Sequence, residues 1–162
     1  MIKIINGDLL DSDAQYIAHQ TNCVSHMAAG VAKAIFDAHP HADVYSQRDN
    51  SHDPIKQWKT IKICGDDNER LVINMFSQFY PGSPGIHNND FDSAKDRQNA
   101  FYICLNQIAK IPNLESIAFP YKIGCGLAGG DWSYYSGLLN NFERHVSKKI
   151  NTEVFLYKKD LK

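Results

Sequence analysis

The feature that most constrains this chain is the stretch FPYKIGCGLAGGDW at residues 119–132. An apolar strand ends there at Pro120, four glycines follow within seven residues, and a helix-compatible sequence begins at Trp132. In a strand, glycine turn and helix unit, backbone N–H groups converge on an anion at the helix N-terminus. Glycines cost backbone entropy, so four together indicate a ligand close to the main chain. The alternative is a tight connection whose glycines only supply positive φ.

A second glycine-bearing loop lies earlier in the chain, at residues 21–30. We call it the first glycine loop, and residues 124–132 the second. Asn22 carries donors and acceptors that suit ribose hydroxyls. Ala29 and Gly30 are small enough for close approach, and the N–H groups of Gly30 and Val31 open a helix at its positive dipole end. Two such loops predict a ligand with more than one phosphate. His26 could titrate near neutral pH. The alternative is that Asn22 and Ser25 only satisfy a bent loop and that His26 is solvated.

The composition of the chain limits its domain organisation and the classes of function to expect. The 162 residues are 43% hydrophobic and 22% charged, with a formal net charge of -1, which predicts one domain spanning residues 1–162. Without a long basic run, a dedicated nucleic-acid binder is not expected. The four cysteines show no CxxC spacing, so we expect free thiols, no metal and no cofactor. No apolar run is long enough to span a membrane, and we expect a cytoplasmic protein.

Hydrophobic periodicity predicts strands at residues 2–6, 16–20, 59–64, 71–76, 116–119 and 153–157. It predicts helices at 31–39, 91–111 and 132–146, a helical turn at 42–48, and a polar loop at 81–89. We interpret residues 87–90 as part of a polar loop rather than a metal site. Alternating strands and helices indicate a mixed or largely parallel sheet covered on both faces. Both glycine loops follow strands, so both are expected to border one crevice at the carboxyl ends.

Three further side chains are candidates for the site. Asp8 follows the first strand, where its carboxylate could accept a hydrogen bond from an adenine amine or merely cap a turn. Asp131 could orient a water molecule or cap the helix that follows it. Tyr157, in the last strand, could lie against a base or be an ordinary core or surface aromatic residue. Position alone does not choose between these roles.

Together these motifs resemble those of the macrodomains, a family that binds ADP-ribose. Residues 5–10 (INGDLL) resemble the opening strand and adenine-site motif, residues 22–32 the first phosphate loop, and residues 123–132 the second. The GCGL form is most similar to the branch with the terminal ADP-ribose protein glycohydrolase and the yeast-type ADP-ribose-1″-phosphate phosphatase. The resemblance implies a three-layer α/β/α sandwich with a mixed central sheet of about six strands.

The resemblance also implies roles for individual residues. Asp8 would bind the adenine amine beside the backbone of Leu9, and Tyr157 would flank the adenine. Asn22 would lie near the distal ribose. One phosphate would be held by the N–H groups of Gly30 and Val31, in the loop that includes Ala29. The diphosphate and distal ribose would be wrapped by Gly124, Cys125, Gly126, Leu127 and Ala128.

Two departures from the glycohydrolase pattern bear on function. Its catalytic aspartate directly follows GCGL, where this chain has Ala128, and its nucleophilic lysine has no counterpart in residues 77–89. The lysyl-adduct mechanism therefore does not transfer. We expect ADP-ribose binding together with hydrolysis of ADP-ribose-1″-phosphate or of an ADP-ribose ester on a protein, with Asp131 or His26 as general base. The alternatives are a module that binds ADP-ribose without turnover, and a nucleotide or nucleic-acid binder of another class.

Overall fold

The computed structural model describes residues 1–85 and 91–159, and a six-stranded sheet forms its centre. The strands lie in the order β1-β6-β5-β2-β4-β3. All neighbouring strands are parallel except β3 and β4, which form an antiparallel pair. The strand bounds are β1 Lys3–Asn6, β2 Tyr16–Gln20, β3 Ile61–Cys64, β4 Val72–Met75, β5 Ser116–Pro120 and β6 Glu153–Lys158. The mixed sheet predicted from the sequence is confirmed.

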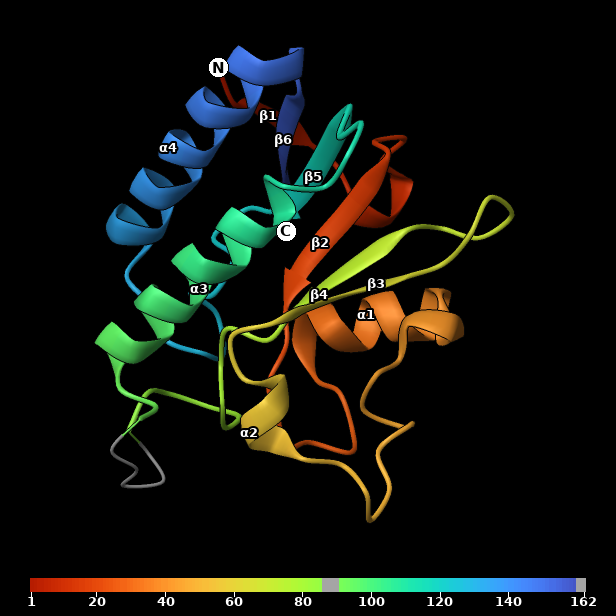
Figure 1. Cartoon of the computed structure of the whole chain (residues 1–162), viewed down its shortest axis with the longest axis vertical. Helices are drawn as coiled ribbons and strands as arrows, with labels where there is room; N and C mark the ends of the chain where they lie inside the picture. Colours follow the sequence, from red (N-terminus) through yellow and green to blue (C-terminus); the bar gives the residue numbers. More distant parts are fainter. Residues whose placement is uncertain (86–90, 160–162) are drawn as a thin grey trace.

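Helices cover both faces of the sheet, as Figure 1 shows. The helices α3 (Ala94–Ile108) and α4 (Trp132–Ile150) lie on one face, and α1 (Gly30–Ala38) lies on the other. The short helix α2 (Pro54–Gln57) and the 3-10 turns η1 (Leu9–Asp11) and η2 (Pro40–Ala42) complete the described elements. The three-layer α/β/α architecture is therefore confirmed.

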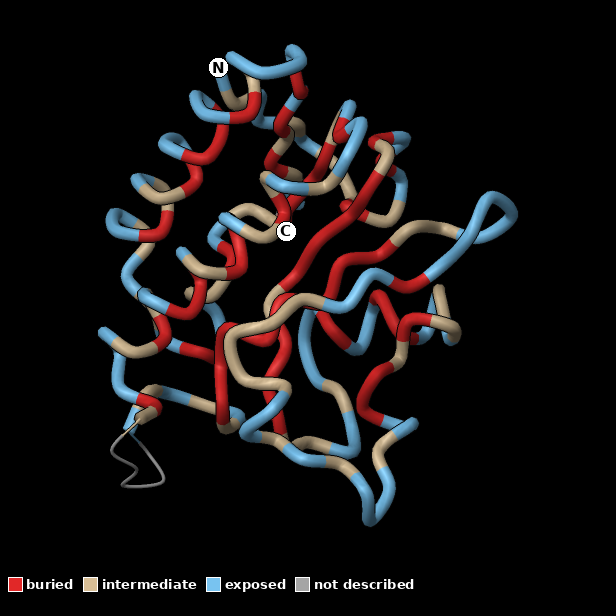
Figure 2. Tube along the Cα trace, viewed as in Figure 1, coloured by how far each residue is buried: buried red, intermediate tan, exposed pale blue. Residues whose placement is uncertain are grey.

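Side chains that alternate along the strands divide the core into two parts. In β5, Ile117 and Phe119 pack in the cluster beneath α3 and α4, whereas Ala118 packs in the cluster beneath α1. Successive residues of a strand point to opposite faces, so one apolar run can supply both clusters. Figure 2 shows the buried trace following the central strands and one side of the long helices. Burial of this apolar surface is the main force that holds the layers together.

Several element ends differ from the sequence prediction. The helix predicted at 91–111 begins only at Ala94, because Ser93 and Asp96 form a reciprocal capping box. The helix predicted at 132–146 continues to Ile150 and ends at Asn151, whose φ of 58° is left-handed. Helix α2 was not predicted. Residues 42–48 contain the end of η2 and a turn at 44–47 rather than a continuous helical segment.

Two sequence predictions concern residues that the structure describes only in part or not at all. The polar loop predicted at 81–89 is described as far as Gly85, and residues 87–90, interpreted as polar loop rather than metal site, lie outside the described residues.

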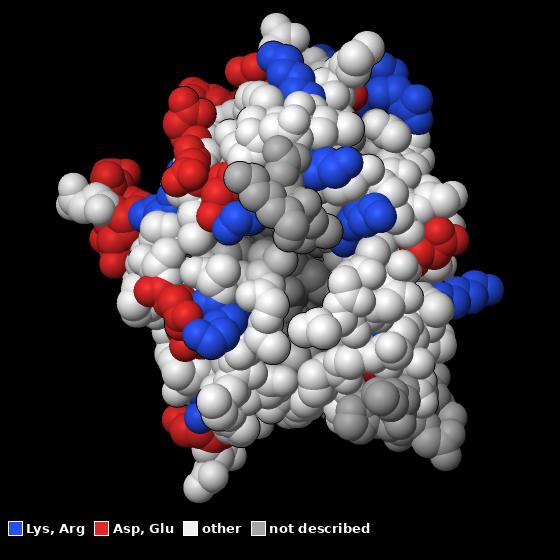
Figure 3. All heavy atoms as spheres, turned by 180° about the vertical axis from the view of Figure 1, so that it is seen from behind, with Lys and Arg blue, Asp and Glu red and all other residues white. Residues whose placement is uncertain are grey.

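In the described ranges, no helix is both long and apolar enough to cross a membrane. Figure 3 shows the face opposite to that of Figure 1, where basic and acidic side chains both occur and neither covers the face.

Candidate functional site

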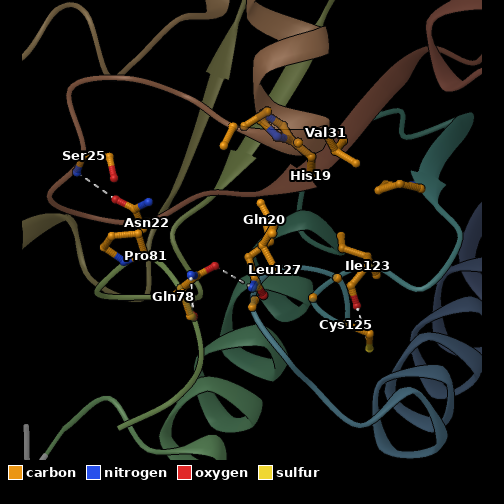
Figure 4. Close-up of a pocket in the computed structure, with 18 of the residues that line it drawn as sticks. His19, Gln20, Asn22, Ser25, Val31, Gln78, Pro81, Ile123, Cys125 and Leu127 are labelled. Atoms are coloured by element: carbon orange, nitrogen blue, oxygen red, sulfur yellow. Dashed lines mark hydrogen bonds between the residues drawn. The ribbon is translucent and has the colours of Figure 1, made fainter. Parts of the chain in front are cut away.

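The two glycine loops meet at one cavity of about 420 Å³, beyond the carboxyl ends of β2 and β5 (Figure 4). These strands are neighbours in the sheet and run in the same direction, so the loops that follow them leave from the same edge. This is the crevice that the strand positions predict. Nine of the predicted ligand-binding residues line it: Asn22, Ala29, Gly30, Val31, Gly124, Cys125, Gly126, Leu127 and Ala128.

Several backbone N–H groups of the second glycine loop have no acceptor within the protein and could donate to a ligand. Three of its N–H groups are used internally. That of Cys125 donates to the carbonyl of Lys122 (3.0 Å), that of Gly129 to Gly126 (3.0 Å) and that of Gly130 to Gly124 (2.9 Å). The chain reverses at Gly124, whose φ of 79° suits glycine. Within the described residues, four N–H groups of this loop that belong to cavity-lining residues donate to no acceptor: those of Gly124, Gly126, Leu127 and Ala128.

The first glycine loop ends in a helix N-terminus that no side chain caps. Ala29 occupies the N-cap position and makes no side-chain hydrogen bond. The N–H groups of Gly30, Val31 and Ala32 belong to the first turn of α1, where an α-helix has no internal acceptors. All four residues line the cavity. The positive end of the α1 dipole therefore faces the same space as the second glycine loop.

A buried ion pair holds the second glycine loop from behind. Arg97 is 1% exposed and binds Asp92 through two hydrogen bonds, Nε to Oδ1 at 2.8 Å and Nη2 to Oδ2 at 2.7 Å. Its Nη1 also donates to the carbonyls of Gly82 (2.7 Å) and Ala128 (3.3 Å), both of which line the cavity. Asp92 in turn accepts from the N–H of Phe79 at 3.0 Å. One guanidinium thus connects two loops that have no regular secondary structure.

Polar side chains that the sequence analysis did not single out form another part of the cavity lining. Gln20 donates to Gln78 (3.0 Å) and accepts from the hydroxyl of Ser77 (2.9 Å). His19 is 1% exposed, and its Nε2 lies 2.7 Å from Oδ1 of Asn74. Burial lowers the pKa of His19 to about 4, so the imidazole is neutral at pH 7. The sequence feature that could have indicated these lining residues is the pair of polar residues at the end of the otherwise apolar strand 16–20.

The predicted adenine-binding residues form a separate group at the ends of β1 and β6. Asp8 caps η1, where its Oδ1 accepts from the N–H of Leu10 (3.0 Å), and its Oδ2 pairs with Lys159 (3.2 Å). The hydrogen bond from Leu10 is the main cause of the lowered pKa of Asp8. Leu9 is buried, and Tyr157 packs beside Gly7. Asp8, Leu9 and Tyr157 do not line the 420 Å³ cavity, and their adenine role stays a prediction.

The two predicted catalytic side chains also lie outside the cavity lining. Asp131 is the N-cap of α4, where its Oδ1 accepts from the N–H of Ser133 at 3.0 Å. Its charge adds to the larger effect of burial in raising the pKa of the cavity-lining Cys125 to about 11. His26 is exposed on the first glycine loop. Their catalytic roles stay predictions.

Comparison with known proteins identifies the fold. No family model matches the chain. A curated relative, the uncharacterized 17.5 kDa protein of the tk-vs intergenic region of Enterobacteria phage T4, is 22% identical over 147 residues, which cover 88% of this chain and 90% of the relative. A solved structure of a protein of unknown function from Bacteroides thetaiotaomicron superposes with a TM-score of 0.74 at 23% identity and covers 98% of both chains.

Solved macrodomains superpose over similar lengths. The macrodomain of Mycobacterium tuberculosis DarG gives a TM-score of 0.71 at 19% identity over 97% of both chains. An Oceanobacillus iheyensis macrodomain mutant with ADPR gives 0.64 at 15% identity over 96% of this chain and 83% of that chain. The chain therefore has the macrodomain fold. At these identities the superpositions do not distinguish the branch that the GCGL motif resembles.

The buried imidazole of His19 makes stability depend on pH. In the unfolded chain its pKa is close to 6.5, whereas the folded protein holds it at about 4. Between these values the unfolded state binds more protons, so the free energy of unfolding falls as the pH falls. We predict that His19 accounts for about 2 kcal/mol of the loss between pH 7 and pH 5.

Urea unfolding of the wild type and of His19→Gln at both pH values measures this contribution. Glutamine can still donate to Asn74 but does not titrate, so the variant should lose less stability on acidification. Equal losses in the two proteins would show that His19 does not titrate with the depressed pKa.

Proposed function

We propose that the cavity binds ADP-ribose and that the two glycine loops hold its diphosphate. The observation that carries this proposal is a pair of donor sets without acceptors that border one cavity: the N–H groups in the first turn of α1, and those of Gly124, Gly126, Leu127 and Ala128. Backbone N–H groups at a helix N-terminus and in a glycine turn stabilise phosphate oxygens without a metal or a cationic side chain. The cavity volume of about 420 Å³ lies in the range of roughly 300–1,000 Å³ that small ligands occupy.

The rest of the ligand follows from the positions of the loops. In this proposal Asn22 binds the distal ribose, since its Oδ1 accepts from the N–H groups of Val24 and Ser25, which leaves the amide NH₂ as the donor for a ligand. Asp8, Leu9 and Tyr157 bind the adenosine end. The macrodomain fold supports ADP-ribose as the ligand class, because one superposed macrodomain structure was solved with ADPR.

A valine at position 126 should block the diphosphate without disturbing the fold. A Cβ at Gly126 meets no atom within 4 Å, so the added side chain would stand in the space where the ligand lies. We predict that Gly126→Val weakens ADP-ribose binding by at least about tenfold, or 1.4 kcal/mol, in isothermal titration calorimetry.

Gly137→Val is the matched control, because Gly137 is exposed on α4 and its Cβ also meets nothing within 4 Å. Both variants should unfold within about 2 °C of the wild type. Wild-type affinity in Gly126→Val would contradict the placement of the diphosphate.

We further propose that the bound ligand is an ADP-ribose derivative that the protein hydrolyses, either ADP-ribose-1″-phosphate or an ADP-ribose ester on a protein. Asp131 and His26 are the candidate bases that would activate water. Of these we propose Asp131, because its charge acts on the cavity-lining Cys125. The competing function is a module that binds ADP-ribose without turnover. It is supported by the absence of any Asp or Glu from the cavity lining in residues 1–85 and 91–159.

Asp131→Asn separates the two functions. Asparagine also caps helices well, so α4 should stay intact, but it cannot act as a general base. We predict that the variant hydrolyses ADP-ribose-1″-phosphate or an esterified ADP-ribosyl protein at least about 100-fold more slowly. Its affinity for ADP-ribose should stay within about twofold of the wild type.

Product formation from both substrates measures this difference. Turnover equal to that of the wild type would remove Asp131 from the mechanism. A wild type that binds ADP-ribose and converts neither substrate would support the non-catalytic function.

A further inference from the structure

Arg48 holds the first glycine loop by its backbone from outside the cavity. Its Nη1 donates to the carbonyl of Ser25 and its Nη2 to the carbonyl of Asn22, both at 2.6 Å. The guanidinium is itself fixed, since Nη2 also donates to Gln57 (2.7 Å) and Cζ lies 4.7 Å from the ring centre of Tyr45. Arg48 does not line the cavity, but Asn22, Ser25 and Tyr45 do. The contact therefore acts on the ligand site through the loop.

The turn at residues 22–25 depends on such contacts because side chains, rather than a strand or helix, form most of the hydrogen bonds to its backbone. The carboxamide Oδ1 of Asn22 accepts from the N–H groups of Val24 and Ser25 (3.0 and 2.8 Å), a bond drawn for Ser25 in Figure 4. The hydroxyl of Tyr45 accepts from the N–H of Asn22 at 2.8 Å. Arg48 then donates to the carbonyls at both ends of this turn, those of Asn22 and Ser25. Without it, two carbonyl oxygens that repel an anion would lose their partner.

The charge of Arg48 is not neutralised by a contact with a carboxylate. In the described part of the chain it forms no salt bridge, and Asp43 acts on it only electrostatically. Arg97 differs, since Asp92 pairs with it directly at 2.7 Å. Burial lowers the pKa of Arg48, but an arginine stays protonated in a protein. A half-buried cation next to the loop contributes more potential than the same charge in water.

We propose that Arg48 is a positioning residue for diphosphate binding. It fixes the turn at residues 22–25 that leads to the α1 N-terminus, and its unpaired charge favours an anion in the cavity without touching the ligand. This inference rests on the proposed binding of ADP-ribose. It predicts that Arg48 matters for the phosphates of a ligand and hardly for its nucleoside.

Three variants and two ligands test this prediction. Arg48→Met removes both the charge and the two carbonyl contacts, whereas Arg48→Lys keeps the charge and can donate to fewer acceptors. Arg144→Met removes an exposed arginine on α4 and controls for the change in net charge. Calorimetry with ADP-ribose and NMR titration with adenosine, which has no phosphate, give the two affinities.

We expect Arg48→Met to bind ADP-ribose at least about tenfold more weakly, Arg48→Lys about threefold more weakly, and Arg144→Met like the wild type. Adenosine affinity should stay within about twofold in all three. ADP-ribose binding by Arg48→Met should also depend less on salt.

Unchanged ADP-ribose affinity in Arg48→Met, or equal losses for ADP-ribose and adenosine, would overturn the inference. If Arg48→Met does not fold, the comparison of the two ligands in Arg48→Lys decides in the same way. A wild type that binds neither ligand would overturn the proposed function as well.

Discussion

The buried pair of Arg97 and Asp92 is the contact on which the cavity depends most. A guanidinium taken out of water must be paired and fully hydrogen-bonded, and Arg97 meets this requirement with Asp92 and with backbone carbonyls of two loops. Those loops, at residues 79–83 and 124–131, have no strand or helix to fix them. Because one side chain serves both, the walls of the cavity are fixed relative to each other. The donors that face a ligand are then held in place before it binds.

The topology of the sheet determines where the two glycine loops meet. Parallel neighbours β2 and β5 end at the same edge, so the first and second glycine loops lie opposite each other. Each loop leaves backbone N–H groups without internal acceptors, and each is braced from behind by an arginine, Arg48 or Arg97. The arrangement suits a diphosphate, because phosphate oxygens can receive several N–H groups at once. Small residues at 28–30, 124–126 and 128–130 leave space for a ligand close to the main chain.

Local patterns predicted the fold and the cavity well. Apolar alternation located all six strands, and glycines after strands predicted that the two loops would meet. The rest depended on contacts far apart in the sequence. Arg97 lies in a helix with a polar pattern, where a charge is usually exposed, and its burial follows only from Asp92 and the loop carbonyls. His19 and Gln20 join the cavity because of their partners Asn74 and Gln78, more than fifty residues away. The roles of Asp8 and Tyr157 rest on the resemblance, and those of Asp131 and His26 rest on their positions in the sequence.

The N–H groups of the cavity-lining residues in both loops can be observed directly by titrating ¹⁵N-labelled protein with ADP-ribose and following the amide signals by NMR. If both loops hold the diphosphate, the signals of Gly30, Val31, Gly126, Leu127 and Ala128 should shift together and saturate at one ligand equivalent. Signals of the distant face of α4 should stay in place. Saturable binding that leaves these five amides unshifted, or that shifts only one loop, would contradict a shared diphosphate site.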